Sequence, residues 1–531
     1  MSVGERYEKH VARCHVICDA LGLPRAAGSA FVASMRQRFP DGAGGMRNDA
    51  ADGMRKAAAL RRRVGLLCQA FFGRLPRWDE FEAPTRFEAG DAEAVAGRLL
   101  AMPDHRRAAA ALRGLSVPDP SALVVDVSHT LRFHANGGIQ RVVRSLILQL
   151  QEMGVQHLFT RFCRHTHAYL PLDPDASKGL AVPPPRRSAA ARAASRAWAA
   201  IRRAGRPDGT TALFLWDRPL LIPELVAERE RGDALCALLA SAPLASTLVF
   251  YDAIPLRHPE FFDTGIRAGY ASYLRLLRHV DGVSCISAAV EDDVRTILRL
   301  VDRRGPPPVL TTHALGADFR VAATPRDAGG PTVGETAADR PLVLCVGTIE
   351  PRKNQLRILD AMVHAQSLGS RFTGVFVGNA GWLNGAFREA LARRIADGFN
   401  LELHENVDDE RLAGFYARAA FTVYCSIAEG FGLPIIESVM RRKVCVTSRR
   451  GSMQEVADRL GGCVLVDPDD TDDIARAITR LLAEPDVLAA HQREADAAHW
   501  PGWADYAAEL HRFCTTLAPG GARGAAEPLA A

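Results

Sequence analysis

Residues 426–440 have the sequence SIAEGFGLPIIESVM, in which two glutamates, Glu429 and Glu437, stand eight positions apart. The preceding run TVYCS, residues 422–426, is short and mostly apolar, which is typical of a buried strand. Pro434 suits the first turn of a helix, where an N–H group would have no partner in any case. The segment therefore predicts a strand, a loop and a helix, with one carboxylate in the loop and the other on the helix.

The loop between the two glutamates is rich in glycine. Gly430 and Gly432 would let a ligand approach the backbone amides closely, because neither residue carries a side chain. Phe431 stands between them, and its place in a loop predicts an exposed ring. The apolar residues of the helix recur with the spacing of one buried face: Ile435, Ile436, Val439 and Met440. Glu437 is expected to point away from that face.

Similar short apolar runs occur along most of the chain, separated by helical stretches. The runs that predict strands are 122–127, 247–252, 282–287, 341–347, 372–378, 419–426 and 443–448. The helices predicted in the second half are 354–368, 408–418, 434–441, 470–483 and about 502–516. Such an alternation is typical of parallel sheets that are covered by helices. The chain is therefore expected to be an α/β protein.

Changes in composition divide the chain into regions. Residues 1–115 are rich in Arg and Ala, and they predict a helical N-terminal region of unknown role. Residues 322–340 are rich in Gly, Pro, Thr and acidic residues, and they read as a linker. The first α/β domain is thus expected at 120–325 and the second at 340–500. A last helix at 501–517 is expected to pack back on the first domain.

The overall composition excludes several classes of protein. The chain has 531 residues with 66 basic and 61 acidic side chains, and this net charge of +5 does not indicate a nucleic-acid-binding protein. The eleven cysteines have no paired C-x-x-C spacing, so free thiols in a reducing compartment are expected. No apolar run approaches the roughly 20 residues of a membrane span. The sequence therefore predicts a cytoplasmic protein.

A second stretch with chemical character is VGTIEPRKNQLRILDA, residues 346–361. A strand is expected to end at Gly347, and a polar loop then places Arg352 and Lys353 just before a helix. Ligands bind at strand ends in open α/β sheets, and a helix N-terminus favours anions. Two cations at such a point suggest a diphosphate site, although an Arg-Lys pair on a solvated loop would give the same pattern.

Taken together, residues 347–354 and 429–437 resemble the nucleotide-sugar site of the retaining glycosyltransferases of family 4, which have the GT-B fold. The two glutamates of that family have the E-x7-E spacing of Glu429 and Glu437. The resemblance extends over essentially all of residues 340–485. It implies two Rossmann-like domains that face a cleft, and the helical N-terminal region would be an addition to them.

The resemblance also implies a role for each matching residue. Lys353 would bind the diphosphate, and Arg352 would supply a second charge, because the family's usual arginine after the strand-end glycine is Thr348 here. Glu429 would hold hydroxyls of the transferred sugar and Glu437 those of the ribose. We therefore expect Glu429, Lys353 and Arg352 to carry the catalysis. The further donor contacts that the resemblance implies are Gly347, Thr348, Gly430, Phe431, Gly432, Leu433 and, at the base, Val407.

The N-terminal domain resembles the family more loosely. DVSHTLRFHANGGIQRVVRSL, residues 126–146, resembles the family's first strand, glycine loop and helix, in which Gly137, Gly138 and Arg141 would face the cleft. An ordinary helix entry would explain the same two glycines. FYDAIPLRHPEFF resembles a strand end that approaches the sugar, and it would place Asp252 there.

A strongly basic segment, residues 187–204, interrupts the first domain with the sequence RSAAARAASRAWAAIRRA. Helical spacing separates its arginines from Trp198 and Ile201, so the helix could lie on an anionic membrane surface. A helix docked on the protein with a solvated arginine face is the plainer interpretation. RNA binding is a third and weaker interpretation of the segment, because no aromatic residues are interleaved with the charges.

These observations predict a retaining glycosyltransferase that moves a hexose from a nucleotide sugar to a glycan or lipid-linked acceptor in cell-surface polysaccharide assembly. GGIQR and YDAIPLRHPE resemble the mannosyl- and rhamnosyltransferases of the family, so a GDP-linked donor is expected. No metal or other cofactor is expected. The alternatives are a non-catalytic subunit that binds a sugar nucleotide or glycan, and an epimerase or phosphorylase of the same fold. Peripheral contact with the inner face of a membrane is possible through 187–204.

Overall fold

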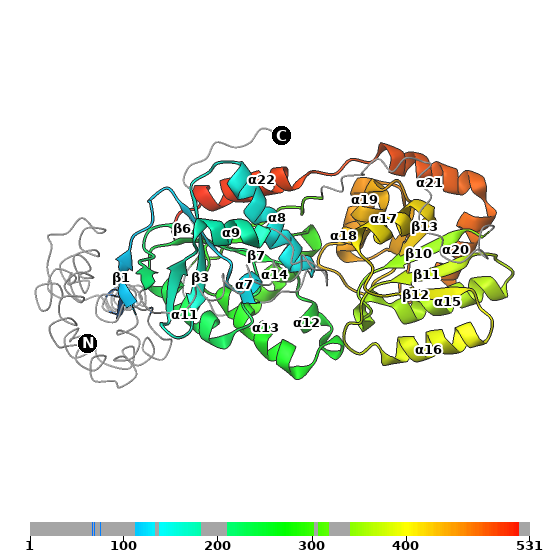
Figure 1. Ribbon diagram of the computed structural model, residues 1–531, viewed down its shortest axis with the longest axis horizontal. Coiled ribbons are helices and arrows are strands. Elements are labelled where there is room, and N and C mark those ends of the chain that lie inside the picture. Colours follow the sequence, from blue (N-terminus) through cyan, green and yellow to red (C-terminus); the bar gives the residue numbers. More distant parts are fainter. Residues whose placement is uncertain are drawn as a thin grey trace, which may run out of the picture.

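The computed structural model describes residues 66, 68, 69, 75, 112–132, 137–181, 210–301, 306–317 and 340–519. These residues form two α/β domains side by side along the long axis of the molecule (Figure 1). The expected fold class, two Rossmann-like domains of the GT-B type, is confirmed. Most of the helical region predicted at 1–115, the basic segment 187–204 and nearly all of the linker at 322–340 lie outside the described residues.

The C-terminal domain is built on a six-stranded parallel sheet with the order β12-β11-β10-β13-β14-β15. Its strands are β10 (Leu342–Val346), β11 (Thr373–Val377), β12 (Leu401–His404), β13 (Ala419–Tyr424), β14 (Cys445–Ser448) and β15 (Cys463–Val466). Short apolar runs form these strands because a parallel sheet is covered on both faces, so that both rows of side chains are buried.

The alternation of side chains along each strand fills two separate hydrophobic clusters. In β10, Val343 and Cys345 pack in one cluster, whereas Leu344 packs in the other. In β11, Phe376 belongs to the first cluster and Val375 to the second. Since successive residues of a strand point to opposite faces, the two clusters are the two sides of one sheet.

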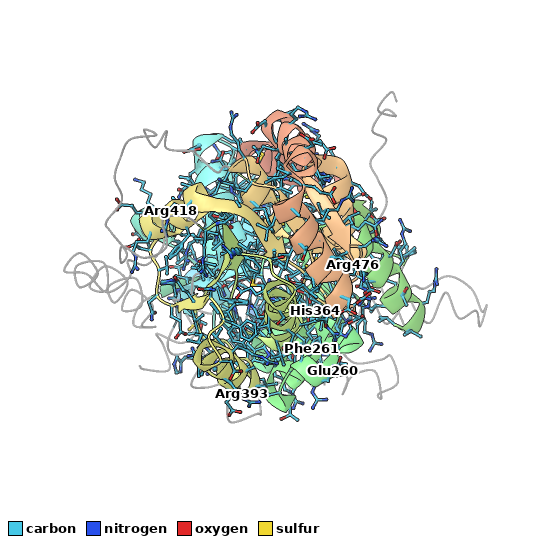
Figure 2. The ribbon with its side chains drawn as sticks, turned by 90° about the vertical axis from the view of Figure 1, so that its right-hand side faces the viewer. Glu260, Phe261, His364, Arg393, Arg418 and Arg476 are labelled. Carbon is cyan, nitrogen blue, oxygen red and sulfur yellow. The ribbon has the colours of Figure 1, made fainter. Side chains whose placement is uncertain are left out.

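Helices cover both sides of this sheet (Figure 1). They are the 3-10 helix η3 (Pro351–Lys353) and the α-helices α15 (Gln355–Ser367), α16 (Gly385–Ala396), α17 (Asp409–Arg418), α18 (Leu433–Met440), α19 (Gly451–Leu460), α20 (Thr471–Ala483) and α21 (Pro485–Ala497). Viewed from the outer end of the domain, α15 with His364 and α20 with Arg476 lie next to each other (Figure 2). His364 contacts Asp472 at 3.1 Å across that pair of helices.

The N-terminal domain has a seven-stranded sheet with the order β4-β3-β2-β6-β7-β8-β9, in which only β4 runs antiparallel. Its strands are β2 (Leu123–Asp126), β3 (His157–Cys163), β4 (Ala168–Pro171), β6 (Pro219–Ile222), β7 (Ala245–Phe250), β8 (Gly282–Cys285) and β9 (Val309–Thr312). Its helices are α7 (Ser128–Arg132), α8 (Gly138–Glu152), α9 (Pro174–Ala181), α11 (Arg229–Ser241), α12 (Ile254–Arg257), η2 (Pro259–Phe261), α13 (Thr264–Leu276) and α14 (Ala288–Leu300).

Each sheet has one point at which the strand order reverses. In the C-terminal domain the chain starts at β10 and moves outward on one side before it returns to β13 on the other. In the N-terminal domain the same reversal lies between β2 and β6. Ligands of open α/β sheets bind beyond the carboxyl ends of the strands at such points. The topology thus singles out the segments that follow β10, β13, β2 and β6.

One part of the sequence prediction is wrong. Residues 112–115 belong to the region predicted to be helical, but they lie in the strand β1 (Leu112–Ser116). This strand pairs in parallel with β5 (Thr210–Leu213), almost a hundred residues later in the chain. A pairing over such a distance in sequence overrides the local preference of an alanine- and arginine-rich segment.

The last helix returns to the first domain. α22 (Trp503–Thr516) packs against α8 and the strands β6 and β7, and runs along the top of the N-terminal domain in Figure 1. The segment before it runs beside the end of the N-terminal domain, where the Trp500 indole donates to the Leu315 carbonyl at 2.8 Å. A side chain at Gly316 would lie 2.5 Å from the Gly502 carbonyl oxygen, so the two segments touch through their backbones.

A network of buried charges lies at the reversal point of the N-terminal sheet. The Arg231 guanidinium donates two hydrogen bonds to Asp126, at 2.8 and 3.0 Å, and one to Glu224 at 2.9 Å. Tyr169 donates to the same Asp126 oxygen at 2.6 Å. Glu224 also accepts from the Thr130 amide at 2.8 Å, which fixes the first turn of α7. Arg231, Asp126 and Glu224 are at most 2% exposed.

Replacing Arg231 by methionine is expected to lower the free energy of unfolding by about 3–5 kcal/mol, because two carboxylates would remain buried without a countercharge. The measurement is urea unfolding of the full chain. The control is Arg229→Met on the same helix, whose side chain is 87% exposed. We expect the control to change stability by less than about 0.5 kcal/mol. Equal effects of the two substitutions would contradict this account of the network.

Candidate functional site

Two loops meet at the reversal point of the C-terminal sheet, one after β10 and one after β13. Asn354 joins them: its side-chain amide donates to the Cys425 carbonyl at 3.0 Å and to the Pro468 carbonyl at 2.7 Å. Its backbone is left-handed, with φ of 62°, a conformation that asparagine tolerates better than most residues. The Ile427 amide also donates to the Arg352 carbonyl at 2.8 Å. The first loop is thereby held against the second.

Glu429 lies at the centre of this junction. Its carboxylate contacts the Arg352 guanidinium at 2.7 Å and the Lys353 ammonium at 2.6 Å. Tyr424, at the end of β13, donates a hydrogen bond to the same carboxylate at 2.8 Å. The structure therefore brings together the three residues that sequence reasoning expected to carry the catalysis.

Burial and charge act in opposite directions on these groups. Burial alone would raise the pKa of Glu429, but Arg352 and Lys353 lower it to about 2. Burial lowers the pKa of Lys353, and this effect exceeds that of the Glu429 charge. Burial also disfavours the charged form of Arg352, yet Glu429 and Glu350 together raise its pKa. The Glu429 carboxylate is thus ionised at neutral pH and is held between two cations.

The sequence analysis missed two members of this cluster. The Tyr424 hydroxyl lies between Lys353 and Glu429 and hydrogen-bonds both. Glu350 contacts Arg352 at 2.7 Å and is 4% exposed, and burial raises its pKa. Tyr424 looks like an ordinary strand residue in the sequence, and Glu350 stands beside a proline in a loop. Only its position within the charged stretch 346–361, two residues before Arg352, could have pointed to Glu350.

The helix that follows the loop begins at a glycine with a special conformation. Gly432 has φ of 125° and precedes the first turn of α18. The amides of Phe431, Gly432 and Leu433 have no hydrogen-bond acceptor among the described residues. The Phe431 ring, which was expected to be exposed, is only 4% exposed and packs edge-on against Trp500 at 5.9 Å. The prediction was wrong because this loop faces the other domain rather than solvent.

Glu437 lies one turn further along α18. It is 8% exposed and contacts Arg441 at 3.4 Å. Burial raises its pKa, while the charges of Arg141 and Arg441 act in the opposite direction. Arg141 belongs to α8 of the other domain, and its side chain is exposed. Glu437 is thus influenced by a cation from across the domain interface.

The carboxyl end of β7 approaches the Glu429 cluster from the N-terminal domain. Asp252 is half-buried, and burial raises its pKa whereas the nearby Arg352 lowers it. The two domains touch here through Gly430, where a side chain would lie 2.1 Å from the Tyr251 carbonyl oxygen and 3.1 Å from Asp252 Cβ. The structure thus places Asp252 at the same junction as the three charged residues of the C-terminal domain.

Further contacts hold the domains in this arrangement. The Ser287 hydroxyl donates to the Gly430 carbonyl at 2.8 Å, and Glu455 accepts from the Ala288 amide at the start of α14 at 3.0 Å. The Trp382 indole donates to the Phe261 carbonyl. Phe261 and its neighbour Glu260 lie toward the lower edge of the view along the long axis (Figure 2).

The remaining predicted residues have more varied positions. Gly347 follows β10, and Thr348 next to it is exposed. Val407 is buried in the cluster on one face of the sheet, so that its backbone rather than its side chain could meet a base. Gly137 and Gly138 are exposed at the start of α8.

Among the described residues no helix combines the length and the apolar character that crossing a membrane requires. In the same parts of the chain, no three His, Cys, Asp or Glu side chains are grouped so that they could hold a metal ion. The acidic pair Asp467 and Asp469 contacts Arg450, at 3.6 and 2.8 Å.

Comparisons with known proteins agree with the geometry. Residues 333–498 match the family model of Glycosyl transferases group 1. The chain is 27% identical over 413 residues to the serotype-specific mannosyltransferase WbdA of Escherichia coli, covering 75% of this chain and 45% of that protein. It is 33% identical over 142 residues to the O-antigen chain mannosyltransferase B of Escherichia coli, covering 27% of this chain and 36% of that protein.

The chain spans about half the length of the WbdA relatives that it matches. Among solved structures, that of Anabaena Alr3699/HepE in complex with UDP and glucose is similar, with a TM-score of 0.52 and 15% identity over 75% of this chain and all of that one. This likeness concerns the fold. The resemblance to glycosyltransferases of the mannosyltransferase type that the motifs indicated is confirmed.

The low pKa of Glu429 predicts a pH dependence of stability. A carboxyl group whose pKa falls on folding, here from 4.5 to about 2, stabilises the native state above its unfolded pKa, and this stabilisation is lost as the pH falls through the folded pKa. Between about pH 5 and 2 the wild type should lose about 3 kcal/mol that Glu429→Gln does not lose. Urea unfolding at several pH values measures the difference. If the difference in unfolding free energy between the two proteins stays constant with pH, the low pKa of Glu429 in the ion cluster is contradicted.

Gly430→Ala is expected to disturb the contact between the domains. Its new methyl group would collide with the Tyr251 carbonyl, and overpacking of this kind costs about 1–3 kcal/mol. Urea unfolding should show a lower midpoint concentration of urea. Small-angle scattering should show a larger radius of gyration, because the domains move apart. Gly414→Ala, on α17 with no atom within 4 Å of the new methyl group, is the control and should leave both unchanged or raise stability slightly. Two variants that behave alike would argue against the contact.

Proposed function

We propose that this chain, which carries a group 1 glycosyl transferase domain in residues 333–498 and has the GT-B fold, is a retaining glycosyltransferase. It would transfer a hexose from a nucleotide-diphosphate sugar to a glycan or lipid-linked acceptor. The donor would bind at the reversal point of the C-terminal sheet, and the acceptor would approach from the N-terminal domain.

One observation carries this proposal: Arg352, Lys353 and Glu429 form a buried ion cluster beside three amides at a helix start that have no acceptor within the described parts of the chain. Two cations and these amides suit a diphosphate, since both favour negative charge. A carboxylate next to them suits the hydroxyl groups of a sugar, because it can accept several hydrogen bonds. Together these groups are complementary to a nucleotide-diphosphate sugar.

The same groups could support the chemical step. The bond between the sugar C1 and the diphosphate oxygen breaks, and its electron pair stays on that oxygen. Arg352, Lys353 and the amides would stabilise this growing negative charge, which is larger in the transition state than in the bound donor. The acceptor hydroxyl forms the new bond to C1, and its proton passes to the departing diphosphate oxygen. Asp252, which faces the cluster from the other domain, lies on the acceptor side.

Glu429 would mainly position the donor. Its ionised carboxylate keeps Arg352 and Lys353 in place and can bind sugar hydroxyls with its remaining lone pairs. Glu437 would hold the ribose. The backbone of Val407 would contact the base. Retention at C1 is proposed on the resemblance of the E-x7-E segment alone.

The choice of sugar rests on the relatives. Both of the relatives described above are named as mannosyltransferases, and one of them is named for an O-antigen chain. We therefore propose mannose as the sugar, a GDP-linked donor and a cell-surface polysaccharide as the acceptor. The fold neighbour in complex with UDP makes a uridine nucleotide the alternative to be tested beside it.

The first test is thermal unfolding of the full chain with GDP, UDP, ADP, CMP or dTDP. A ligand that binds only the native state stabilises it by about 2.7 kcal/mol at a hundred times its dissociation constant. GDP should raise the melting temperature, and Lys353→Ala and Glu437→Ala should weaken binding at least tenfold. Glu410→Ala, an exposed glutamate on α17, is the control and should bind as the wild type does. No stabilisation by any of these nucleotides would overturn the proposal.

Turnover separates an enzyme from a binding subunit. GDP-mannose should be consumed by the wild type in the presence of a mannan acceptor, and Lys353→Ala should reduce the rate at least a hundredfold. The anomeric configuration of the product, determined by NMR, reports retention. Nucleotide binding without consumption of any donor would support a non-catalytic subunit instead.

A further inference from the structure

A cavity of about 340 Å³ opens beyond the carboxyl ends of strands in the N-terminal sheet, and no residue of the Glu429 cluster lines it. Its walls come from three segments that each follow the carboxyl end of a strand: α7 after β2, the end of β3, and the start of α11 after β6. The side chains that matter here are Arg132, Arg161, Phe162, Arg164, Glu228 and Arg231. The cavity has the size of a pocket for a small organic ligand.

The floor of this cavity is rigid. Arg231 is fixed by its hydrogen bonds to Asp126 and Glu224, and it also contacts Glu228 at 3.6 Å. Although burial would raise the pKa of Glu228, His129 and Arg231 lower it to about 2, so this carboxylate is ionised. A ligand would therefore meet charged groups that are already held in position.

Arg161 is the one cation of the cavity wall without a carboxylate. It is half-buried, burial lowers its pKa, and its guanidinium makes no hydrogen bond or ion pair with any residue that the structure describes. Arg132 and Arg164, by contrast, contact Glu228 at 3.2 Å and Glu230 at 3.8 Å. A half-buried guanidinium with five unused donors costs free energy unless a ligand or water satisfies it.

The mixture of groups favours a sugar over a simple anion. Four arginines and two glutamates line the cavity, so they offer both donors and acceptors, and a sugar hydroxyl is both at once. The ring of Phe162 and the side chain of Leu131 add an apolar wall, against which the C–H face of a sugar ring can pack. An isolated phosphate would meet the Glu228 and Glu230 carboxylates beside the arginines and would leave the apolar wall unused.

The position of the cavity relates it to the proposed reaction site. β3, β2, β6 and β7 are parallel, so their carboxyl ends lie along one edge of the sheet. The end of β3 is three strand spacings from the end of β7, which is roughly 14 Å. Asp252, which faces the Glu429 cluster, follows β7. An extended oligosaccharide with one end at that cluster could place a residue several units away in the cavity.

We propose that this cavity is a glycan subsite that binds a sugar residue of the acceptor at a distance from the growing end. That the bound glycan is an acceptor rests on the proposed function, whereas the binding of a glycan in the cavity does not. Such a subsite lets the protein recognise a chain of several sugars rather than a single one.

The test is ligand-observed NMR of the full chain without nucleotide, with neutral tetrasaccharides of mannose, glucose or galactose and the matching monosaccharides. At least one tetrasaccharide should bind, and its monosaccharide should bind at least tenfold more weakly. Arg161→Ala and Arg164→Ala should each weaken tetrasaccharide binding at least tenfold. Arg229→Ala lies on the same helix start but does not line the cavity, so it should bind as the wild type does. Unchanged thermal unfolding would show that each variant is folded.

Three outcomes would overturn the inference. Binding of none of the tetrasaccharides by the wild type is one, and binding that is insensitive to both arginine substitutions is another. The third is binding of inorganic phosphate that requires Arg161, which would make the cavity an anion site. Thermal unfolding with GDP separates a failure of the subsite from a failure of the proposed function, because Arg161→Ala should leave the stabilisation by GDP unchanged. A GDP response without glycan binding would remove only the subsite, and glycan binding without a nucleotide response would remove only the transferase.

Discussion

The pairing of Glu429 with Arg352 and Lys353 is the interaction on which the ligand edge of the C-terminal domain depends. None of these charges would be tolerated alone at that depth, because each has lost most of its contact with water. Together they fix two loops that are more than seventy residues apart in the chain, and Asn354 joins the same loops through neutral hydrogen bonds. The free helix amides and Asp252 of the other domain gain their defined positions from that arrangement.

Much of this architecture could be predicted from local patterns. The α/β alternation gave both sheets, and helices such as α15 and α20 begin within a residue of their predicted starts, since Asn354 and Asp470 mark their N-termini. The charged residues of the two motifs were also recognised as one site. These features depend on periodicity, capping and spacing, all of which are properties of short stretches of sequence.

What could not be predicted depends on contacts between distant parts of the chain. β1 pairs with a strand almost a hundred residues away, and Phe431 is buried because its loop faces the other domain, with the Trp500 ring packed against it. Tyr424 joins the charged cluster because strand β13 ends at its position, which a run of apolar residues does not reveal. The Arg231 network likewise combines residues from three separate segments, none of which has a motif of its own.

The return of α22 to the N-terminal domain has a consequence for how the chain acquires its structure during synthesis. Five residues of this helix are buried: Tyr506, Ala507, Leu510, Phe513 and Cys514. They complete the core of a domain whose strands leave the ribosome some two to four hundred residues earlier. Until then that core exposes an apolar face, which is a hazard for aggregation. Of these two domains, the one translated earlier is therefore completed later, and its maturation must wait for synthesis of the other.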